Sequence, residues 1–573
     1  MTVGLLPAFP TLAWVGNTAS GVRSSLLILV TSALVSGCDG QLIRLAAPPA
    51  LSGNSPSPED SSPPVVLDPP VEPDNPGPVD VTFSVRSDTG VRPISPLIYG
   101  INGGGQLANT GAGLVRLGGN RWTAWNWETN ASNAGSDYQF QNDGFLSSSN
   151  TAGQAVATTM DAAFAVGAQV LATVPIVDYL AADKNGGGDV RGSGTDYLTT
   201  RFRQNRARKN SALSSSPNAT DAFVYQDEFV AWLKTRSQST GVLFSLDNEP
   251  DLWADTHAPI HPSPVGYDEL VRRNVEYARA IKSQWPEANI CGFVSYGFNG
   301  YVNLQDAPDS AGKGEFIDYF LAEVRAAEQA DGFRLIEHLD LHWYPEATGG
   351  GTRITNPSSA AAVSAARVQA PRSLWDPTYR ETSWVANFLG APIRLIPRMQ
   401  AKIDANNPGV TLAFTEWNYG GGGHISGAMA TADVLGIFGR ESVAVAAFWP
   451  LNGDESYAYA AFRAFRNFDG AQGAFGDTSI FAESNDNAVG SVYASVDSNN
   501  VSRVVVVAVN KSTSPKTAGL TVAHPTQFSR ARVFTLAAGS TNISEGPNVT
   551  AVATNAFRVT LPAMSVTTLL LVQ

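Results

Sequence analysis

Short apolar runs alternate with amphipathic segments between residues 81 and 475. Eight of the runs have the pattern of buried strands, and they end at SPLIYGING, GLVRLGGNR, VLATVPIVDY, VLFSLDNEP, NICGFVSYG, HLDLHWYP, TLAFTEWNYG and VAVAAFWPL. The clearest helix lies between two of them at residues 266–284, where apolar side chains recur at helical spacing and Pro286 follows. Because a doubly wound sheet would not need eight such strands, the alternation predicts an α/β fold, a (β/α)8 barrel of the TIM type with long loops.

The pattern changes after residue 475. Segments such as GSVYASVDSNNVSRVVVVAVNKS and FRVTLPAMSVTTLLLVQ have strands and turns but no convincing helix. They predict a C-terminal β-sandwich at residues 476–573. The run VTFSVRSDTG precedes the first barrel strand, and we expect residues 81–92 to pair with the sandwich and to make the two domains one rigid body.

The N-terminal region has the pattern of an export signal. An apolar run at residues 25–37 follows Arg23 and is too short to span a bilayer. It ends in VSGC, which resembles the lipobox of bacterial lipoproteins, so residues 1–38 are predicted to be a signal peptide with lipidation at Cys38. An ordinary secretory signal or a hydrophobic N-terminal helix are the alternatives. Residues 39–80 are rich in proline and acidic, which is typical of an extended linker. We therefore expect an exported, lipid-anchored protein.

Charge and composition narrow the possible ligands. The net charge is −13 without a block of Lys or Arg, so a nucleic-acid partner is not expected. The chain contains 12 Trp, 16 Tyr and 26 Phe, whose flat faces suit stacking on ring-shaped ligands. It has no G-x-S-x-G elbow, H-E-x-x-H motif or paired C-x-x-C, which disfavours a serine or zinc hydrolase. The two cysteines need no redox role, and a monomer is the default expectation.

The stretch SLDNEPDLW at the end of the fourth strand carries the first candidate for chemistry. Alternation places Val242, Phe244 and Leu246 on one face and Leu243, Ser245, Asp247 and Glu249 on the other, towards the barrel axis. Pro250 disfavours helical geometry at the preceding residue, so we expect Glu249 to stay extended at the strand tip. A polar turn is the alternative, but a turn would not need this alternation.

A second glutamate ends the seventh strand. The carboxyl ends of barrel strands form the active site, so Glu249 and Glu416 are predicted to face each other across the mouth. Paired carboxyl groups are the constellation of a glycosidase, in which one protonates the departing oxygen and the other attacks the anomeric carbon or activates water. For either glutamate alone a structural ion pair is the alternative. Tryptophans near the same strand ends would suit a sugar cleft, although each could equally be a core residue: Trp122, Trp125, Trp127, Trp253, Trp343, Trp417 and Trp449.

Three blocks closely resemble glycoside hydrolase family 44: VRLGGNRWTAWNWETNASNAGSDY, SLDNEPDLW and FTEWNYGGGGHISGAMATADVLGIFGRE. The likeness extends from about residue 81 to the C-terminus. It implies an endo-acting β-1,4-glucanase that cleaves cellulose-like chains, often also xyloglucan, and retains the anomeric configuration. The family pattern makes Glu249 the acid/base and Glu416 the nucleophile. The family more often has Tyr where Trp417 stands, which does not disturb this assignment. A xylanase or other hemicellulase, or a non-catalytic glycan-binding lipoprotein, are the alternative functions.

Further residues are predicted to contact the β-glucan. Asn248 could bond the sugar 2-hydroxyl or cap its loop, and His342 and Tyr344 could orient the nucleophile or the substrate, although a lone histidine is often structural. Arg116, on the inner face of the second strand, could hold the nucleophile ionised or form a structural ion pair. The predicted contact set is completed by Asn120, Trp122, Trp127, Trp253, Trp417 and Trp449.

One further pattern concerns a metal. The segment DKNGGGD places oxygen ligands among glycines, the chemistry that Ca²⁺ prefers, and family members can carry a structural calcium ion. The candidate ligands are Asp183, Asp189 and, from a neighbouring loop, Glu128. A plain turn is the alternative, because the motif is incomplete beside a true calcium loop. No cofactor is expected for the chemistry itself.

Overall fold

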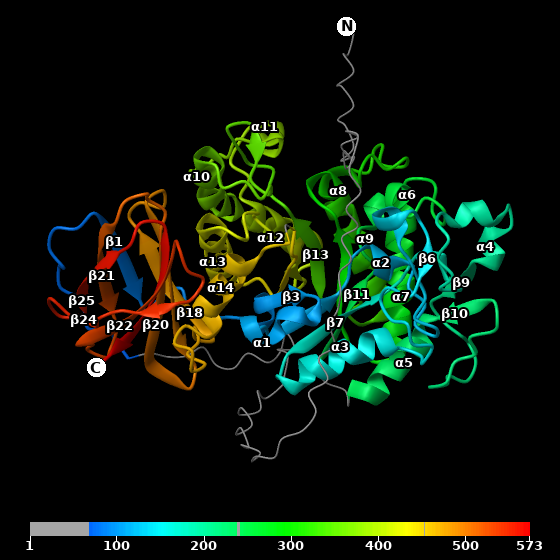
Figure 1. Cartoon of the computed structure of the whole chain (residues 1–573), viewed down its shortest axis with the longest axis horizontal. Coiled ribbons are helices and arrows are strands. Elements are labelled where there is room, and N and C mark those ends of the chain that lie inside the picture. Colours follow the sequence, from blue (N-terminus) through cyan, green and yellow to red (C-terminus); the bar gives the residue numbers. More distant parts are fainter. Residues whose placement is uncertain (1–67, 238–240, 452) are drawn as a thin grey trace, which may run out of the picture. The chain divides into compact units, whose positions relative to one another are not determined.

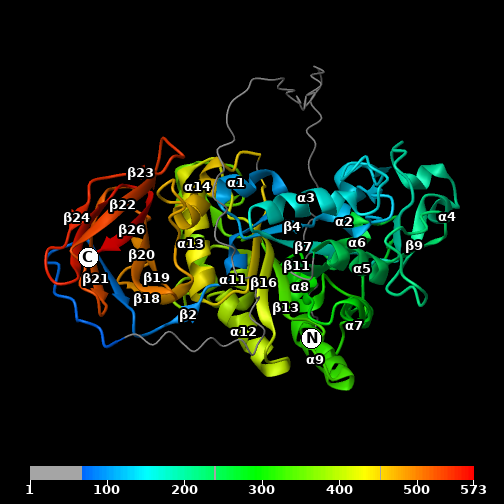
Figure 2. The ribbon, with the colours of Figure 1, turned by 90° about the horizontal axis from the view of Figure 1, so that it is seen from below.

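The computed structural model describes residues 68–237, 241–451 and 453–573. Its central feature is a closed barrel of parallel strands surrounded by helices, seen in Figure 1 and, turned by 90°, in Figure 2. The eight strands are β3 (Gly100–Asn102), β4 (Leu114–Leu117), β7 (Gln169–Val174), β11 (Val242–Leu246), β12 (Asn289–Ser295), β13 (His338–Trp343), β16 (Thr411–Trp417) and β17 (Val445–Phe448). The prediction of a (β/α)8 barrel is confirmed, and each strand belongs to one of the eight apolar runs.

Amphipathic helices cover the outside of the barrel. Helix α7 (Tyr267–Gln284) is the one that helical spacing predicted, and it buries its apolar residues against the strands. The other long helices are α3 (Gln154–Ala165), α5 (Gln226–Ser237), α9 (Phe316–Asp331), α12 (Leu395–Asn406), α13 (Ile425–Arg440) and α14 (Ser456–Arg466). None of the helices in the described ranges is long and apolar enough to cross a membrane.

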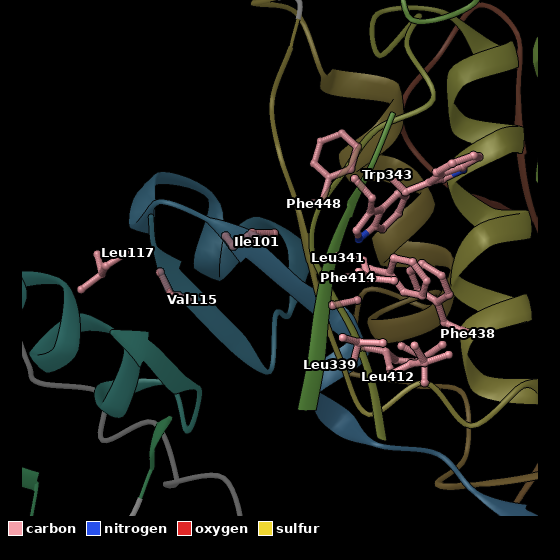
Figure 3. Packing of buried hydrophobic residues seen from close by; sticks show 14 of the residues in the cluster. Ile101, Val115, Leu117, Leu339, Leu341, Trp343, Leu412, Phe414, Phe438 and Phe448 are labelled. Atoms are coloured by element: carbon pink, nitrogen blue, oxygen red, sulfur yellow. The ribbon is translucent and has the colours of Figure 1, made fainter. Parts of the chain in front are cut away.

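Two apolar layers stabilise the barrel. Outward side chains of the strands pack against the helices, and Figure 3 shows Leu412 and Phe414 of β16 on the same side as Phe438 of α13. A smaller cluster fills the interior near the amino ends of the strands; it consists of Leu97, Leu114, Leu171, Leu243, Cys291, Ala413 and Val445. Because this layer closes the interior, polar side chains are confined to the other end, where the strands finish.

The C-terminal region forms a sheet that encloses its own apolar core. Its main strands are β18 (Thr478–Ser484), β19 (Gly490–Asp497), β20 (Asn500–Asn510), β21 (Lys516–Ala523), β22 (Arg530–Ala537), β25 (Ala556–Leu561) and β26 (Ser565–Val572). Strand β1 (Val81–Arg86) lies between β18, to which it is antiparallel, and β21, to which it is parallel. The first strand after the proline-rich segment therefore belongs to this sandwich.

The described end of the proline-rich segment also contacts the sandwich. Val71 and His524 form a backbone bridge, and the amide of Asp74 donates to the carbonyl of Thr554. The segment is thus attached to the sandwich from residue 71 onward, ten residues before β1. The predicted signal peptide, Cys38 and the linker up to residue 67 lie outside the described residues.

Helix α13 anchors the sandwich to the barrel. Its Asp433 forms a buried ion pair with Lys511, with 2.6 Å between Oδ2 and Nζ, and it also accepts hydrogen bonds from Ser491 and Tyr493. Both ionised side chains are almost completely buried, so removing either one would leave an uncompensated charge. This contact links the sandwich to the helix that follows β16.

Candidate active site

The polar residues predicted at the strand ends meet at the carboxyl end of the barrel. Glu249 follows β11, Glu416 lies near the end of β16, and His342 lies near the end of β13. One carboxylate oxygen of each glutamate and one ring nitrogen of His342 all lie within 4.8 Å of one another. The sequence therefore identified side chains that come from separate strands and share one site.

The fourth barrel strand has the alternation that the sequence predicts. Val242, Phe244 and Leu246 pack in the layer between strands and helices, whereas Leu243 belongs to the barrel interior. The expectation of an extended Glu249 is wrong, because this residue has φ 46° and ψ 54°, in the left-handed region. Pro250 disfavours only the right-handed helical region at the residue before it, so the left-handed conformation stays accessible. This conformation is uncommon outside glycine and is often found at functional sites.

Burial makes Glu249 suited to carry a proton near neutral pH. Its removal from solvent raises the pKa of Glu249 to about 7, opposed by the charge of Arg116 and reinforced by that of Asp137. A carboxyl group is ordinarily ionised at this pH, since its unperturbed pKa is about 4.3. Glu249 can therefore act as a general acid where an exposed glutamate could not.

Glu416 has a different environment, rich in hydrogen-bond donors. Arg116 donates from Nη1 to Oε1 of Glu416 at 2.7 Å, and the hydroxyl of Tyr344 donates to Oε2 at 2.8 Å. Both carboxylate oxygens of Glu416 therefore have a hydrogen-bond donor. The second guanidinium nitrogen of Arg116 donates to Oδ1 of Asn248 at 2.8 Å, so one arginine orients two neighbours of the reaction centre. Arg116 thus forms an ion pair with the nucleophile candidate, a contact that both interpretations of this residue require.

His342 lies between the two glutamates. Its Nδ1 is 2.8 Å from Oε1 of Glu249 and 3.5 Å from Oε2 of Glu416. Burial, together with the charge of Arg116, lowers the pKa of His342 to about 3, although Glu416 opposes this shift. The imidazole is therefore neutral at working pH, and it positions the carboxyl groups without adding charge.

Three of the predicted aromatic contacts are wrong. The side chains of Trp127, Trp253 and Trp417 are fully buried, so they cannot stack on a sugar. Trp127 packs against Phe229 and donates its Nε1–H to a backbone carbonyl, while Trp253 lies against His261. Each of these tryptophans is a core residue, which was the alternative interpretation of every tryptophan near the strand ends.

The remaining predicted contacts lie around the mouth. Trp449 is half-buried and its ring packs directly on Gly119, where an added Cβ would lie 2.6 Å from it. Trp122 is only 7% exposed and packs edge-on against Trp125. Asn120 donates to Asp137 at 2.7 Å. Trp449 is thus partly exposed, whereas Trp122 is almost completely buried.

The three calcium candidates do not come together. Asp183 forms a two-point ion pair with Arg201, at 2.7 and 2.9 Å, and Asp189 pairs with Arg191. Among the described residues, the one group of three or more His, Cys, Asp or Glu side chains with converging ligand atoms is Glu249, His342 and Glu416. Arginines neutralise both aspartates, and for this reason the set does not fit a calcium ion.

Sequence reasoning missed an aromatic surface beside the mouth. Trp384 and Phe388, on helix α11 (Trp384–Leu389), are 36% and 64% exposed, and both pack against Phe298. Phe298 follows the end of β12, and Trp384 bonds to Glu346, which follows β13. The spacing of four residues between Trp384 and Phe388 could have predicted this surface, because it places both rings on one face of a helix.

Asn102 was also missed. This residue ends β3, and its Oδ1 accepts from Nη1 of Arg116 at 3.0 Å while its Nδ2 donates to the carbonyl of Thr415 at 2.9 Å. It therefore holds both the arginine and the backbone next to Glu416. A single asparagine in the run GINGGG offered no pattern from which this role could be predicted.

Comparison with known proteins agrees with this geometry. The model of glycoside hydrolase family 44 matches residues 131–347. Endoglucanase A of Paenibacillus lautus is 38% identical over 506 residues, which is 85% of this chain and 72% of that protein. The β-mannanase/endoglucanase A of Caldicellulosiruptor saccharolyticus is 36% identical over 514 residues, 84% of this chain but only 38% of that longer protein.

Solved structures show the same relationship. A Paenibacillus polymyxa xyloglucanase from family 44, with xyloglucan, superposes with a TM-score of 0.82 at 38% identity, covering 86% of this chain and 99% of that one. A family 44 endoglucanase from Clostridium thermocellum gives a TM-score of 0.81 at 36% identity with the same two coverages. The chain belongs to glycoside hydrolase family 44, and it is an enzyme.

Proposed function

We propose that this enzyme is an endo-β-1,4-glucanase that cleaves cellulose-like glucans and xyloglucan with retention of anomeric configuration. The observation that carries the mechanism is that one carboxylate oxygen of Glu249 lies within 4.8 Å of one carboxylate oxygen of Glu416. Retaining enzymes need carboxyl groups about 5–5.5 Å apart, whereas inverting enzymes leave about 6.5–9.5 Å for a water molecule. The substrate class is supported by the relatives, which are named as endoglucanases and a xyloglucanase.

The two glutamates then divide the work by their environments. In the first step Glu416 attacks the anomeric carbon while Glu249 donates its proton to the departing glycosidic oxygen. In the second step Glu249, now a base, takes a proton from water, and the water displaces Glu416 from the sugar. Asn248, held by Arg116 and by the amide of Gly119, is placed to bond the 2-hydroxyl of the sugar during both steps.

The experiment that tests this function measures new reducing ends on three polymers. Residues 68–573 are incubated with carboxymethylcellulose, xyloglucan and arabinoxylan, and the first product is followed by proton NMR of the hydrogen on its anomeric carbon. We expect cleavage of at least one glucan and a β-configured first product. Cleavage of arabinoxylan alone would instead identify a xylanase. An α-configured product would exclude the double displacement.

The rate should depend on pH through Glu249. Because its pKa is raised to about 7, the acid form persists to neutrality and is lost as the pH rises further. We expect kcat/KM on xyloglucan to fall above pH 7, by about tenfold per pH unit once the acid is fully ionised. If kcat/KM instead began to fall near the ordinary pKa of a glutamate, this result would contradict the effect of burial on the pKa of Glu249. The measurement is a profile of kcat/KM from pH 4 to pH 9 under constant ionic strength.

Trp384 and Phe388 should bind sugar rings remote from the bond that is cleaved. Replacing Trp384 with alanine removes a flat apolar face worth about 1 kcal/mol, so KM for xyloglucan should rise by roughly fivefold while kcat stays within twofold. The matched control is Phe333→Ala, which removes an aromatic ring that is 48% exposed in the segment before β13, at the amino end of that strand. Equal KM values for the two variants would show that the platform does not contact substrate.

The location of the enzyme is a separate proposal. We infer export and lipid attachment at Cys38 from the apolar run and the VSGC ending. Incorporation of labelled palmitate into the wild-type chain, but not into Cys38→Ala, tests this attachment. Equal incorporation would exclude it.

A further inference from the structure

Strand β16 departs from regular pairing just before Glu416. Asp340 of β13 pairs with Ala413 of β16, and the next pair is His342 with Glu416. Between these two pairs β13 advances by two residues, whereas β16 advances by three. The other neighbour shows the same offset, because Phe414 and Trp417 pair with Ala446 and Phe448 of β17. Both sides of β16 therefore contain one extra residue between Phe414 and Glu416, which is a β-bulge at Thr415.

The bulge decides where Glu416 points. Ala413 faces the barrel interior and Phe414 faces the helices. Strict alternation would continue with Glu416 outward and Trp417 inward. The structure has the opposite arrangement, since Trp417 packs against Phe438 and Phe448 outside the barrel and Glu416 reaches Arg116 inside it. One extra residue exchanges the two faces and delivers the carboxylate to the mouth.

A buried aspartate holds the bulged residue. Oδ1 of Asp340 accepts from the backbone N–H of Thr415 at 3.2 Å, and Oδ2 accepts from its hydroxyl at 2.8 Å. On the other side, the carbonyl of Thr415 accepts from Asn102. A bulge leaves backbone groups without strand partners, and such groups are costly when buried. Asp340 is itself completely buried, and its hydrogen bonds go to Thr415 and to neither glutamate.

We propose that Asp340 is a positioning residue for the nucleophile, which clamps the bulge at Thr415 and thereby aims Glu416 at the anomeric carbon. The inference rests on the proposed role of Glu416. Asp340 does not touch the reacting atoms, so its contribution is to geometry. A displacement of about 1 Å at a reacting group can lower a rate by about a hundredfold, which sets the scale of the effect.

The test measures the attack by Glu416 separately from protonation of the leaving group by Glu249. Asp340→Asn preserves size but exchanges one acceptor oxygen for an amide N–H, so the hydrogen bond from the Thr415 hydroxyl must reverse its direction or be lost. We expect kcat on xyloglucan to fall about a hundredfold with KM within threefold. A 2,4-dinitrophenyl 2-deoxy-2-fluoro-β-cellobioside measures the attack directly: Glu416 forms a bond to the anomeric carbon, and the dinitrophenolate leaves with its electron pair. Intact-mass spectrometry should show labelling slowed by the same factor, because this leaving group needs no proton from Glu249.

Variants of Thr415 and a second buried aspartate serve as controls. Thr415→Ser keeps both groups that Asp340 binds and should label within threefold of wild type, whereas Thr415→Val loses the hydroxyl and should label about tenfold more slowly. Asp433→Asn also replaces a buried carboxylate that accepts from hydroxyl groups, but at the sandwich. It should lower the melting temperature and leave the labelling rate unchanged.

The outcomes distinguish this inference from the proposed function. Folded Asp340→Asn that labels at the wild-type rate overturns the positioning role alone. If Asp340→Asn does not fold, Thr415→Val decides, and labelling equal to that of Thr415→Ser overturns the inference. Wild-type protein that is neither labelled nor active on any glucan overturns the proposed function and, with it, the role of Asp340.

Discussion

Glu249→Gln is expected to lose about 10³-fold in kcat on xyloglucan while it still reacts with 2,4-dinitrophenyl β-cellobioside in the first step. Glutamine keeps the shape of the side chain but has no proton to donate to a poor leaving group. Dinitrophenolate leaves unaided, so Glu416 can still be glycosylated. The second step needs Glu249 as a base, so the glycosylated enzyme should accumulate after a burst of dinitrophenolate. Stopped-flow absorbance and intact-mass spectrometry measure the burst and the intermediate.

Added azide sharpens this test. Azide needs no base, so it should release the trapped sugar from Glu249→Ala as a β-glycosyl azide and restore turnover of the activated substrate. The control is Glu545→Gln, an exposed glutamate of the sandwich that pairs with Arg532. Its rates on xyloglucan and on the activated cellobioside should equal those of the wild type. If Glu249→Gln lost activity equally on the polymer and the activated substrate, without a burst, Glu249 would not be the acid/base.

Glu416→Gln should be the more damaging variant, because it removes the group to which the sugar becomes bonded. We expect a loss on the order of 10⁵-fold in kcat on xyloglucan and on the activated cellobioside alike. The neutral amide would also leave Arg116 without the carboxylate charge to which its Nη1 now donates at 2.7 Å. The guanidinium would then lack its partner at a buried position, so a lower melting temperature should accompany the kinetic loss.

The pattern across substrates separates the two glutamates. Binding of xyloglucan by inactive Glu416→Gln, measured by calorimetry, should stay within threefold of the value for Glu249→Gln, since neither variant removes the aromatic surface. Of the two variants, only Glu416→Gln should fail to be labelled by the 2-fluoro cellobioside. Residual labelling at another residue, located by peptide mapping, would move the nucleophile elsewhere.

The different roles proposed for two side chains of the same type rest on their different surroundings. Burial raises the pKa of Glu249 to about 7, whereas Glu416 accepts hydrogen bonds from Arg116 and Tyr344. The neutral imidazole of His342 contacts both and favours neither by charge. The assignment of acid and nucleophile therefore follows from burial and donors, and it agrees with the family pattern in the motifs DNEP and TEWNYGG.

Much of the scaffold could be predicted from the sequence. Short apolar runs separated by helical periodicity identified all eight barrel strands, and the alternation in VLFSLDNEP correctly divided Leu243 from Phe244. These features depend on which residues can be buried, and the local pattern of apolar and polar residues indicates this. The motifs that contain Glu249 and Glu416 were also recognisable, because parallel strands in a barrel bring their carboxyl ends to one mouth.

Other features depend on contacts between segments far apart in the sequence. Alternation alone would have turned Glu416 outward and Trp417 inward, and only the bulge at Thr415, held by Asp340, exchanges them. Burial of Trp127 and Trp253 depends on neighbours such as Phe229 and His261, which no local pattern reveals.

The sequence by itself determined the family, the barrel and the two glutamates, because period, strand ends and motif spacing are local properties of the chain. The tertiary structure decided which aromatic rings are exposed, that Arg201 and Arg191 neutralise the aspartates of the supposed calcium loop, and the pKa of Glu249. These properties depend on desolvation and on charges contributed by distant segments, which exist only once the chain has folded.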